Sequence, residues 1–291
     1  MKGASQYLAS PITRIGGKYN YLTWVLPQIP EKERSIYIEP FFGSGVVLLN
    51  RAVAQLEVIN DLDKYLIRFM RVLQNKELLE KLRHRLSYTL YSKEEYFLAV
   101  DQLKRNAFQD EVDFAWSYFA DIHQAFCCRA GGGSWGRMIS LDSKQKWGIT
   151  FRWFSGISNI DRFVDRISHA QIENDTAENV IRRYDSEDAI FYCDPPYLPE
   201  TRNGDVYANE MTIEDHQRLL ELLLNCKGAV CLSGYPSALY NETLSEWTLT
   251  KKDVLCQLGR NSPNGIKDAS RVECLWRNPR AMEYFSQQTL F

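Results

Sequence analysis

The sequence lacks the long apolar run that a membrane-spanning helix requires. Its apolar stretches are short, such as Val46-Val47-Leu48-Leu49, against the roughly 20 residues needed to cross a bilayer. The first residues, Met1 to Gln6, contain no apolar core of the kind found in signal peptides. We therefore expect a cytoplasmic protein that has no membrane partner.

Metal-binding and disulfide patterns are also missing. The four histidines are far apart in the sequence, and neither an HExxH pattern nor zinc-finger spacing occurs. The seven cysteines are odd in number and contain no CxxC pair, which favours reduced thiols over a disulfide framework. We expect no metal requirement and a reducing compartment.

Positive and negative charges nearly balance over the whole chain. The formal net charge is −2, and the 45% apolar and 25% charged residues are typical of a globular protein. Residues 127–170 differ, because they hold seven Lys or Arg against three acidic residues. This basic segment also contains a glycine cluster and three tryptophans: Trp135, Trp147 and Trp153. Basic and aromatic residues together suit nucleic-acid phosphates and bases.

Short apolar runs alternate with amphipathic segments near both ends of the chain, which is typical of a parallel sheet covered by helices. Strands are expected at residues 35–39, 56–60, 189–193, 229–232, 247–256 and 272–276. A helix is expected from Val46 to about Ala54, and another between a capping box at Thr212 and Asp215 and an end at Gly228. The prediction is an α/β fold, with a Rossmann-like sheet over 1–75 and 170–291 that has helices on both faces. Residues 76–169 are expected to form an inserted, mainly helical lobe with a β-hairpin.

A glycine loop follows the first predicted strand. Gly43-Ser44-Gly45 allows a ligand to approach the backbone at a helix N-terminus, and Asp61 follows at the end of the second strand. An acid at about this offset commonly holds the ribose hydroxyls of an adenosine-bearing cofactor. Because this loop is not GxGxxG, and because GxxxxGK[ST] does not occur in the sequence, a nucleoside is favoured over a pyrophosphate. By itself the pattern also describes an ordinary tight turn next to a helix-flanking acid.

A second motif, Asp194-Pro195-Pro196-Tyr197, follows an apolar strand. Two consecutive prolines cannot continue a central strand, so they form a rigid turn where open α/β sheets bind ligands. An exocyclic amine has two N–H donors, which Asp194 and the Pro195 carbonyl oxygen can each accept. Tyr197 can stack on the attached ring. The motif therefore predicts a site for a planar amine, and a Pro-Pro loop with a capping Asp remains the structural alternative.

In order along the chain, these motifs resemble those of the Dam-type DNA adenine methyltransferases. The resemblance rests on these segments: Ile15-Gly16-Gly17-Lys18, Glu39-Pro40-Phe41-Phe42-Gly43-Ser44-Gly45, Asn60-Asp61 and Tyr192-Cys193-Asp194-Pro195-Pro196-Tyr197. The stretch Tyr207 to Leu219 also resembles the segment that follows the last of these in relatives. It is clear over residues 10–75 and 170–277 and weak over 76–165. The resemblance implies the S-adenosylmethionine-dependent methyltransferase fold and methylation of the N6 amine of a flipped-out adenine in double-stranded DNA.

The resemblance also implies roles for individual residues. The catalytic turn would consist of Asp194, Pro195, Pro196 and Tyr197. S-adenosylmethionine would contact Arg14, Lys18, Glu39, Pro40, Phe41, Gly43, Gly45, Asp61 and Asp194. Relatives commonly carry an aromatic residue at the position of Arg14, so here the arginine would cover the cofactor instead.

The basic lobe is the expected DNA-binding surface, because swinging a base out of a duplex requires phosphate contacts. Its candidate residues are Arg129, Arg137, Lys144, Lys146 and Arg152. Four alternatives stay open from the sequence: a DNA cytosine-N4 methyltransferase, an RNA substrate, a non-catalytic DNA-binding regulator and, with least support, a dehydrogenase. A cognate restriction endonuclease is a further open partner, for a bacterial or phage-encoded enzyme.

Overall fold

The computed structural model describes residues 7–126, 131, 134–138, 148–201, 209–255 and 270–288, apart from the side chains of residues 255, 270, 287 and 288. The chain forms two compact units, each built from separate stretches of sequence. The first unit comprises residues 1–22, 43–51 and 63–170, and the second comprises 23–42, 52–62 and 171–291. The boundaries predicted for a catalytic domain and an inserted lobe, 1–75 with 170–291 and 76–169, stay a prediction.

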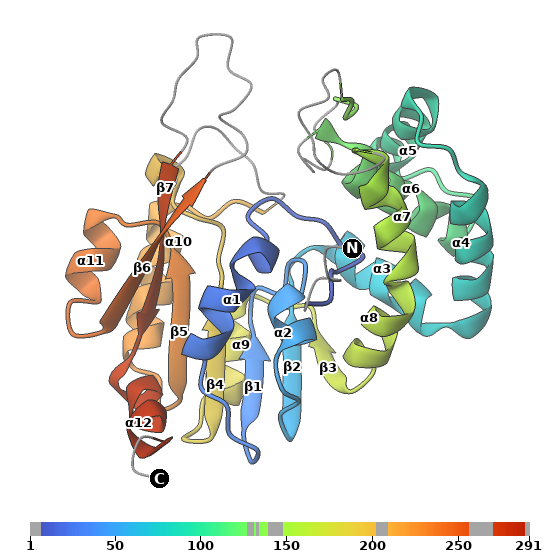
Figure 1. Ribbon diagram of the computed structural model, residues 1–291. Helices are drawn as coiled ribbons and strands as arrows, with labels where there is room; N and C mark the ends of the chain where they lie inside the picture. The colour runs from blue at the N-terminus through green and yellow to red at the C-terminus, as the bar shows by residue number, and fades with distance from the viewer. Residues whose placement is uncertain are drawn as a thin grey trace, which may run out of the picture. The chain divides into compact units, whose positions relative to one another are not determined.

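The second unit has an α/β fold, in which helices flank a mostly parallel sheet (Figure 1). Within the described residues the sheet has seven strands in the order β3-β2-β1-β4-β5-β7-β6. Their bounds, in chain order, are β1 Ile36–Glu39, β2 Leu56–Asn60, β3 Ala170–Glu173, β4 Ala189–Cys193, β5 Ala229–Gly234, β6 Thr248–Leu255 and β7 Ser270–Arg277. The pairs β1–β2, β1–β4 and β4–β5 are parallel, whereas β7 is antiparallel to both β5 and β6. The predicted Rossmann-like sheet is confirmed.

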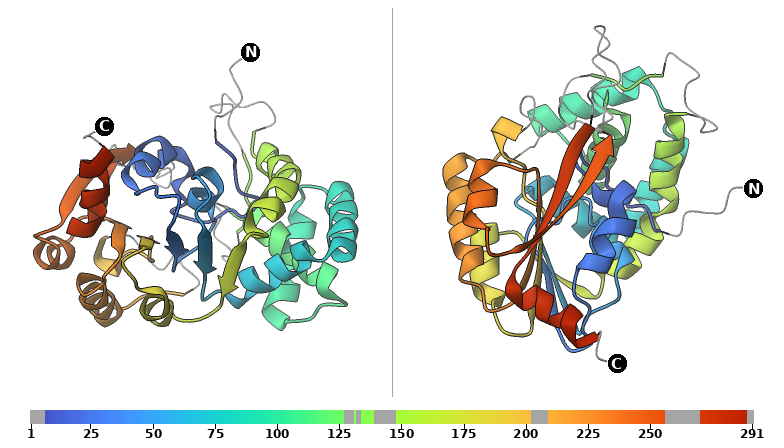
Figure 2. Two further views of the ribbon diagram at one scale, coloured as in Figure 1. Left: turned by 90° about the horizontal axis from the view of Figure 1, so that it is seen from below. Right: turned by 60° about the vertical axis from the view of Figure 1, so that its left-hand side comes forward.

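Helices lie on both faces of this sheet (Figure 2). They are α1 Leu22–Val25, η2 Leu26–Gln28, α9 Ala177–Tyr184, η4 Pro199–Thr201, α10 Ile213–Leu224, α11 Ala238–Thr243 and α12 Pro279–Gln288. On one face, the apolar sides of α9 and α10 bury residues such as Val180 and Leu220 against Val230 and Leu232 of β5. Cys231 points to the other face, where its thiol approaches the carbonyl oxygen of Gln28. Successive side chains of β5 thus point to opposite faces of the sheet and pack on both of them.

Two predicted helix ends differ from the structure. α2 spans Val46–Asn50 and stops before the expected Ala54, because Arg51 turns to an extended conformation and Val53 is left exposed. α10 has the predicted capping box at Thr212 but ends at Leu224, with Asn225 as its C-cap. Gly228 has another role, since a Cβ there would lie 2.7 Å from the carbonyl oxygen of Ala189. The glycine permits this close approach at the start of β4.

The first unit is mainly helical. Its elements are η1 Lys18–Tyr21, α2, α3 Lys64–Gln74, α4 Lys76–Tyr88, α5 Lys93–Arg105, α6 Glu111–Gln124, α7 Thr150–Ser158 and α8 Ile160–Ile167. α6 is the central helix: Val112 to Gln124 are all buried, and α3, α4, α5 and α7 pack against it. Of the expected β-hairpin, the described residues contain one antiparallel bridge, Ala125 to Trp135. The remainder of that expectation falls outside the described residues.

Candidate functional site

The carboxyl end of β1 carries the first group of expected site residues. Glu39 is buried at the strand end, where its Oε1 accepts a 2.8 Å hydrogen bond from the Tyr37 hydroxyl. Pro40 is also buried, and its carbonyl oxygen accepts a 2.9 Å bond from Asn60 Nδ2. Phe41 is half-buried and packs against the core of the second unit. The strand end is therefore fixed to its neighbour β2.

The carboxyl end of β2 presents Asp61. Asn60, the residue before it, connects the strand end to Asp175, whose backbone N–H donates to Asn60 Oδ1 at 2.9 Å. The backbone carbonyl of Asp61 accepts a 2.7 Å bond from Asn174 Nδ2, and the residue is half-buried. These contacts fix the backbone of Asp61 at the strand end.

The turn after β4 carries Asp194 to Tyr197. Asp194 and Pro196 are half-buried, whereas Pro195 and Tyr197 are buried. The Tyr197 hydroxyl lies 3.2 Å from Asp194 Oδ1 and donates a short hydrogen bond to Oε1 of Glu273. Tyr197 is 5% exposed, so a base can stack on its ring only after neighbouring side chains move.

Three carboxylates thus follow adjacent parallel strands of one sheet: Glu39 on β1, Asp61 after β2 and Asp194 after β4. The strand order reverses between β1 and β4, and ligands of open α/β sheets bind outside the carboxyl ends at such a switch point. An ionised carboxylate can accept hydrogen bonds but cannot donate them. The carboxyl ends of these strands therefore suit a ligand rich in hydroxyl, amine or ammonium groups.

The glycines of the loop belong to the first unit. Gly43 and Gly45 have φ of 54° and 67°, a left-handed conformation that side chains rarely adopt. A Cβ on Gly43 would meet no atom within 4 Å, so the space at that position is open. Gly45 is the N-cap of α2, as the strand-loop-helix pattern predicted.

Arg14 and Lys18, the other expected cofactor contacts of the first unit, are both engaged by protein groups. The Arg14 guanidinium donates to Asp63 Oδ2, in a short ion pair, and to the Tyr118 hydroxyl at 2.7 Å. Lys18 is buried, and its Nζ donates to the carbonyl oxygen of Gly16 at 3.1 Å. Asp63 is also the N-cap of α3, so it fixes Arg14 to a helix end.

The expected DNA contacts are only partly described. Arg129, Lys144 and Lys146 lie outside the described residues, whereas Arg137 is exposed and Arg152 is half-buried in the first turn of α7. Trp153, next to Arg152, is buried and packs edge-on against Phe119. This tryptophan belongs to the core of the first unit.

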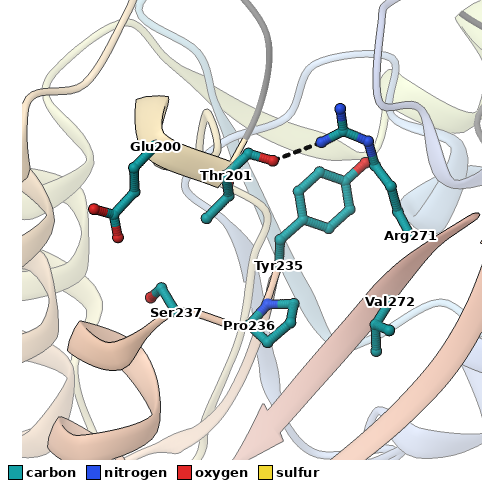
Figure 3. A pocket seen from close by; sticks show the side chains of 7 residues that line it. All are labelled: Glu200, Thr201, Tyr235, Pro236, Ser237, Arg271 and Val272. Carbon is teal, nitrogen blue, oxygen red and sulfur yellow. Dashed lines mark hydrogen bonds between the residues drawn. The ribbon is translucent and has the colours of Figure 1, made fainter. Parts of the chain in front are cut away.

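Sequence reasoning missed a group of residues beside the turn after β4. They line an open pocket of about 470 Å³, to which Tyr235, Arg271 and Thr201 contribute. Figure 3 shows the side chains of this lining. The guanidinium of Arg271 lies over the Tyr235 ring, 5.2 Å from its centroid, and donates to the Thr201 carbonyl oxygen at 2.5 Å. The Tyr235 ring in turn meets the Tyr197 ring edge-to-face, with centroids 4.6 Å apart.

These residues gave no local sequence signal, because the pairing of β7 with β5 brings them to the turn. Gly234 is opposite Cys274, which places the residues just before Cys274 next to the loop after β5. Two neighbours of the turn belong to the core: Cys193 is fully buried, and Tyr192 is buried with its hydroxyl 3.0 Å from Ser233 Oγ. Burial raises the pKa of the Cys193 thiol well above its ordinary value, so this thiol is a core group.

The described residues contain neither a membrane-spanning helix nor a cluster of metal ligands. Within that part of the chain no helix is long and apolar enough to cross a membrane. Over the same residues, no group of three or more His, Cys, Asp or Glu is placed to hold a metal ion.

Comparison with known proteins agrees with this geometry. The chain is 29% identical over 257 residues to the DNA N-6-adenine-methyltransferase of Escherichia phage P1. That match covers 81% of the chain but only 31% of the phage protein, so the chain spans about a third of this relative's length. The sequence profile of the D12 class N6 adenine-specific DNA methyltransferases matches residues 15–252, which include the glycine loop, the basic lobe and the turn after β4. The chain therefore belongs to the D12 class N6 adenine-specific DNA methyltransferase family.

Proposed function

We propose that this protein transfers the methyl group of S-adenosylmethionine to the N6 amine of adenine in double-stranded DNA. The observation that carries the proposal is the turn Asp194 to Tyr197 at the switch point of the sheet, in a chain of this family. Its acceptors suit an exocyclic amine: the Asp194 carboxylate is half-buried and the Pro195 backbone follows it directly. We propose Pro196 as the residue that stiffens the turn.

The cofactor is proposed to bind at the same strand ends. In the second unit, Asp61 is proposed to accept from the ribose hydroxyls, with Glu39, Pro40, Phe41 and Asp194 lining the site. These hydrogen-bond acceptors fit the ligand, since its ribose hydroxyls and α-ammonium group are donors. In the first unit, Gly43 fits as well, because the space at its Cβ position is open. Arg14, Lys18 and Gly45 stay proposed contacts.

The chemistry is a direct in-line displacement, for which the bound cofactor supplies an electrophilic sulfonium methyl group. The amine nitrogen of adenine is a poor nucleophile, because its lone pair is delocalised into the ring. Hydrogen bonds from both N–H groups to Asp194 and to the Pro195 carbonyl favour a pyramidal nitrogen and stabilise its developing positive charge. No protein nucleophile is needed, which agrees with the burial of Cys193.

DNA is proposed to be held by the basic lobe through Arg129, Arg137, Lys144, Lys146 and Arg152. Beside the turn, the pocket of Figure 3 offers an aromatic ring and a guanidinium, which suit a base and a phosphate respectively. We place the enzyme in the cytoplasm of a bacterium or an infected cell, and a cognate restriction endonuclease is a proposed partner.

The test is transfer of tritium from the labelled methyl group to duplex DNA, followed by digestion to nucleosides. N6-methyladenine is the expected product, and N4-methylcytosine would move the assignment to the cytosine enzymes. Failure to transfer to any DNA or RNA, with normal DNA binding, would favour the regulator. Long-read sequencing of DNA from expressing cells would report the modified base and its sequence context together.

A further inference from the structure

We propose that the pocket beside the turn after β4 binds the backbone of the DNA strand that carries the target adenine, with Arg271 holding one of its phosphate groups. The inference rests on the proposed function and adds a DNA-binding residue outside the basic lobe. The pocket has a volume of about 470 Å³, and Thr201, Tyr235 and Arg271 contribute to its lining. All three belong to the second unit, as does the turn itself.

Arg271 forms no ion pair within the part of the chain that the structure describes. Its guanidinium donates to the carbonyl oxygen of Thr201 at 2.5 Å and lies over the ring of Tyr235, 5.2 Å from the centroid. Neither group carries a negative charge, and a guanidinium has further N–H donors beyond the one that this carbonyl accepts. Other arginines of the second unit pair with carboxylates: Arg183, Arg218 and Arg280. Arg271 therefore suits an anion that comes from outside the protein.

A phosphate in a chain is the anion that this pocket favours. The planar fork of an arginine matches two oxygens of one phosphate. An enclosed pocket would suit a small ligand, which such pockets mostly bury, whereas this one is open and can admit a strand that continues beyond it. Figure 3 shows the exposed Glu200 on the opposite side of the pocket from Arg271. Its carboxylate repels phosphates and so favours the side on which Arg271 lies.

The pocket lies next to the turn that is proposed to hold the target amine. The ring of Tyr235 meets the ring of Tyr197 edge-to-face, with centroids 4.6 Å apart. Thr201 ends η4, which follows the turn, so the hydrogen bond from Arg271 joins β7 to this segment. A base that is swung out of a duplex stays attached to its strand, so the phosphates on either side of it must pass close to the turn. Arg271 is placed to hold one of them.

The sheet keeps Arg271 in position before any DNA binds. Arg271 pairs with Val254 of β6, and Val272 directly after it packs against the core of the second unit. The guanidinium is half-buried and oriented by Thr201 and Tyr235. A side chain that is ordered in advance loses little freedom when its ligand binds, which favours a specific phosphate contact.

Arg271→Gln is the informative change, because glutamine keeps a polar side chain without the charge. The slope of log DNA affinity against log salt, measured by the fluorescence anisotropy of a labelled duplex, should fall by about one unit. Arg271→Lys keeps the charge and should keep the slope. Arg280→Gln on α12 is the matched control, since Arg280 pairs with Glu283, and it should also keep the slope. An unchanged slope in Arg271→Gln, or the same loss in Arg271→Lys, would overturn the inference.

Chemical changes to the DNA locate the contact without any change to the protein. Neutral methylphosphonates replace, one at a time, the phosphates that flank the methylated adenine. At one position the replacement should weaken binding to the wild type by about tenfold, and it should leave binding to Arg271→Gln nearly unchanged. Equal losses in both proteins at every position would overturn the inference. Circular dichroism checks that each variant folds.

A failure of the proposed function is distinguishable from a failure of this inference. Wild-type protein that methylates no DNA contradicts the proposed function, and the salt slope of Arg271→Gln on a duplex of random sequence still tests the pocket. Inorganic phosphate is the probe for a small-anion site. If it stabilises the wild type but not Arg271→Gln against thermal unfolding, while both have the same DNA slope, the assignment to DNA is wrong. A slope change seen with duplex RNA alone would also overturn it.

Discussion

Asp194 is the residue on which the proposed chemistry depends most. It follows β4 directly, it is half-buried, and its Oδ1 already has a hydroxyl 3.2 Å away. The loss of one transition-state hydrogen bond to a charged acceptor costs about 3–4 kcal/mol, or two to three decades in rate. We expect Asp194→Ala to show this loss in single-turnover methyl transfer while the protein stays folded and binds DNA.

Two further variants refine this prediction. Asp194→Asn keeps the size and one acceptor oxygen, so its loss should be smaller than that of Asp194→Ala. Tyr197→Ala removes the ring proposed to stack on the base and should lose far more rate than Tyr197→Phe. A near-normal rate for Asp194→Ala would remove the amine-binding role from this turn.

Among the elements, α6 carries two buried titratable groups whose effects on stability oppose each other. Burial raises the pKa of Asp121 to about 6, against a backbone hydrogen bond from Gly131 and the charge of Arg14. Burial also lowers the pKa of His123 to about 4. Between about pH 4 and 6, the folded protein keeps Asp121 protonated and His123 neutral, whereas the unfolded chain has the opposite preference for both.

The signs follow from this linkage. The Asp121 contribution falls as pH rises through this window, because the unfolded chain has released that proton and the folded one holds it. The His123 contribution rises with pH, because there the unfolded chain binds the extra proton. Asp121→Asn leaves only the His123 contribution. In urea unfolding, its stability should rise by up to about 3 kcal/mol from pH 4 to 6.5, more steeply than in the wild type. Equal slopes in both proteins would contradict this.

Residues 127–156, within the basic segment 127–170, are proposed to bind DNA. Each lost phosphate contact lowers the slope of log affinity against log salt by about one unit. Lys144→Ala with Lys146→Ala should therefore weaken binding to all DNA sequences and reduce that slope by up to about two. Lys81→Ala on α4 is the control, because Lys81 is exposed and pairs with Glu77. An unchanged salt slope in the double variant would place the DNA surface elsewhere.

The elements that could be predicted from the sequence are those with local signals. The strands before Pro40 and Asp194 were predicted because short apolar runs ended at prolines, and the capping box at Thr212 was predicted from two residues. The end of α2 was not, because Val53 and Ala54 continue the apolar pattern although the helix stops at Asn50. Glu273 was missed for a different reason. Its contact with Tyr197 depends on the antiparallel pairing of β7, which no local pattern specifies.

On the scale of the whole molecule, both units consist of interleaved stretches of sequence. The boundary between them passes through the glycine loop, between Phe42 and Gly43. The acidic strand ends, Glu39, Asp61 and Asp194, all belong to the second unit, whereas Gly43 and Gly45 belong to the first. A cofactor that binds at the strand ends as proposed should stabilise the folded protein, since anything that binds the native state preferentially shifts unfolding.

Asp61 provides the test at this scale. At about 100 times its dissociation constant a ligand adds about 2.7 kcal/mol of stability, which should raise the unfolding temperature by about 5 °C or more. We expect S-adenosylmethionine to produce this shift in protein stripped of bound cofactor, and Asp61→Ala to abolish most of it. Asp188→Ala is the matched control. Asp188 lies directly before β4, at the opposite end of that strand from Asp194, and pairs with exposed Lys32. A shift that is equal in Asp61→Ala and wild type would place the ribose hydroxyls elsewhere. Calorimetric titration of both variants would distinguish weaker binding from a changed unfolding transition.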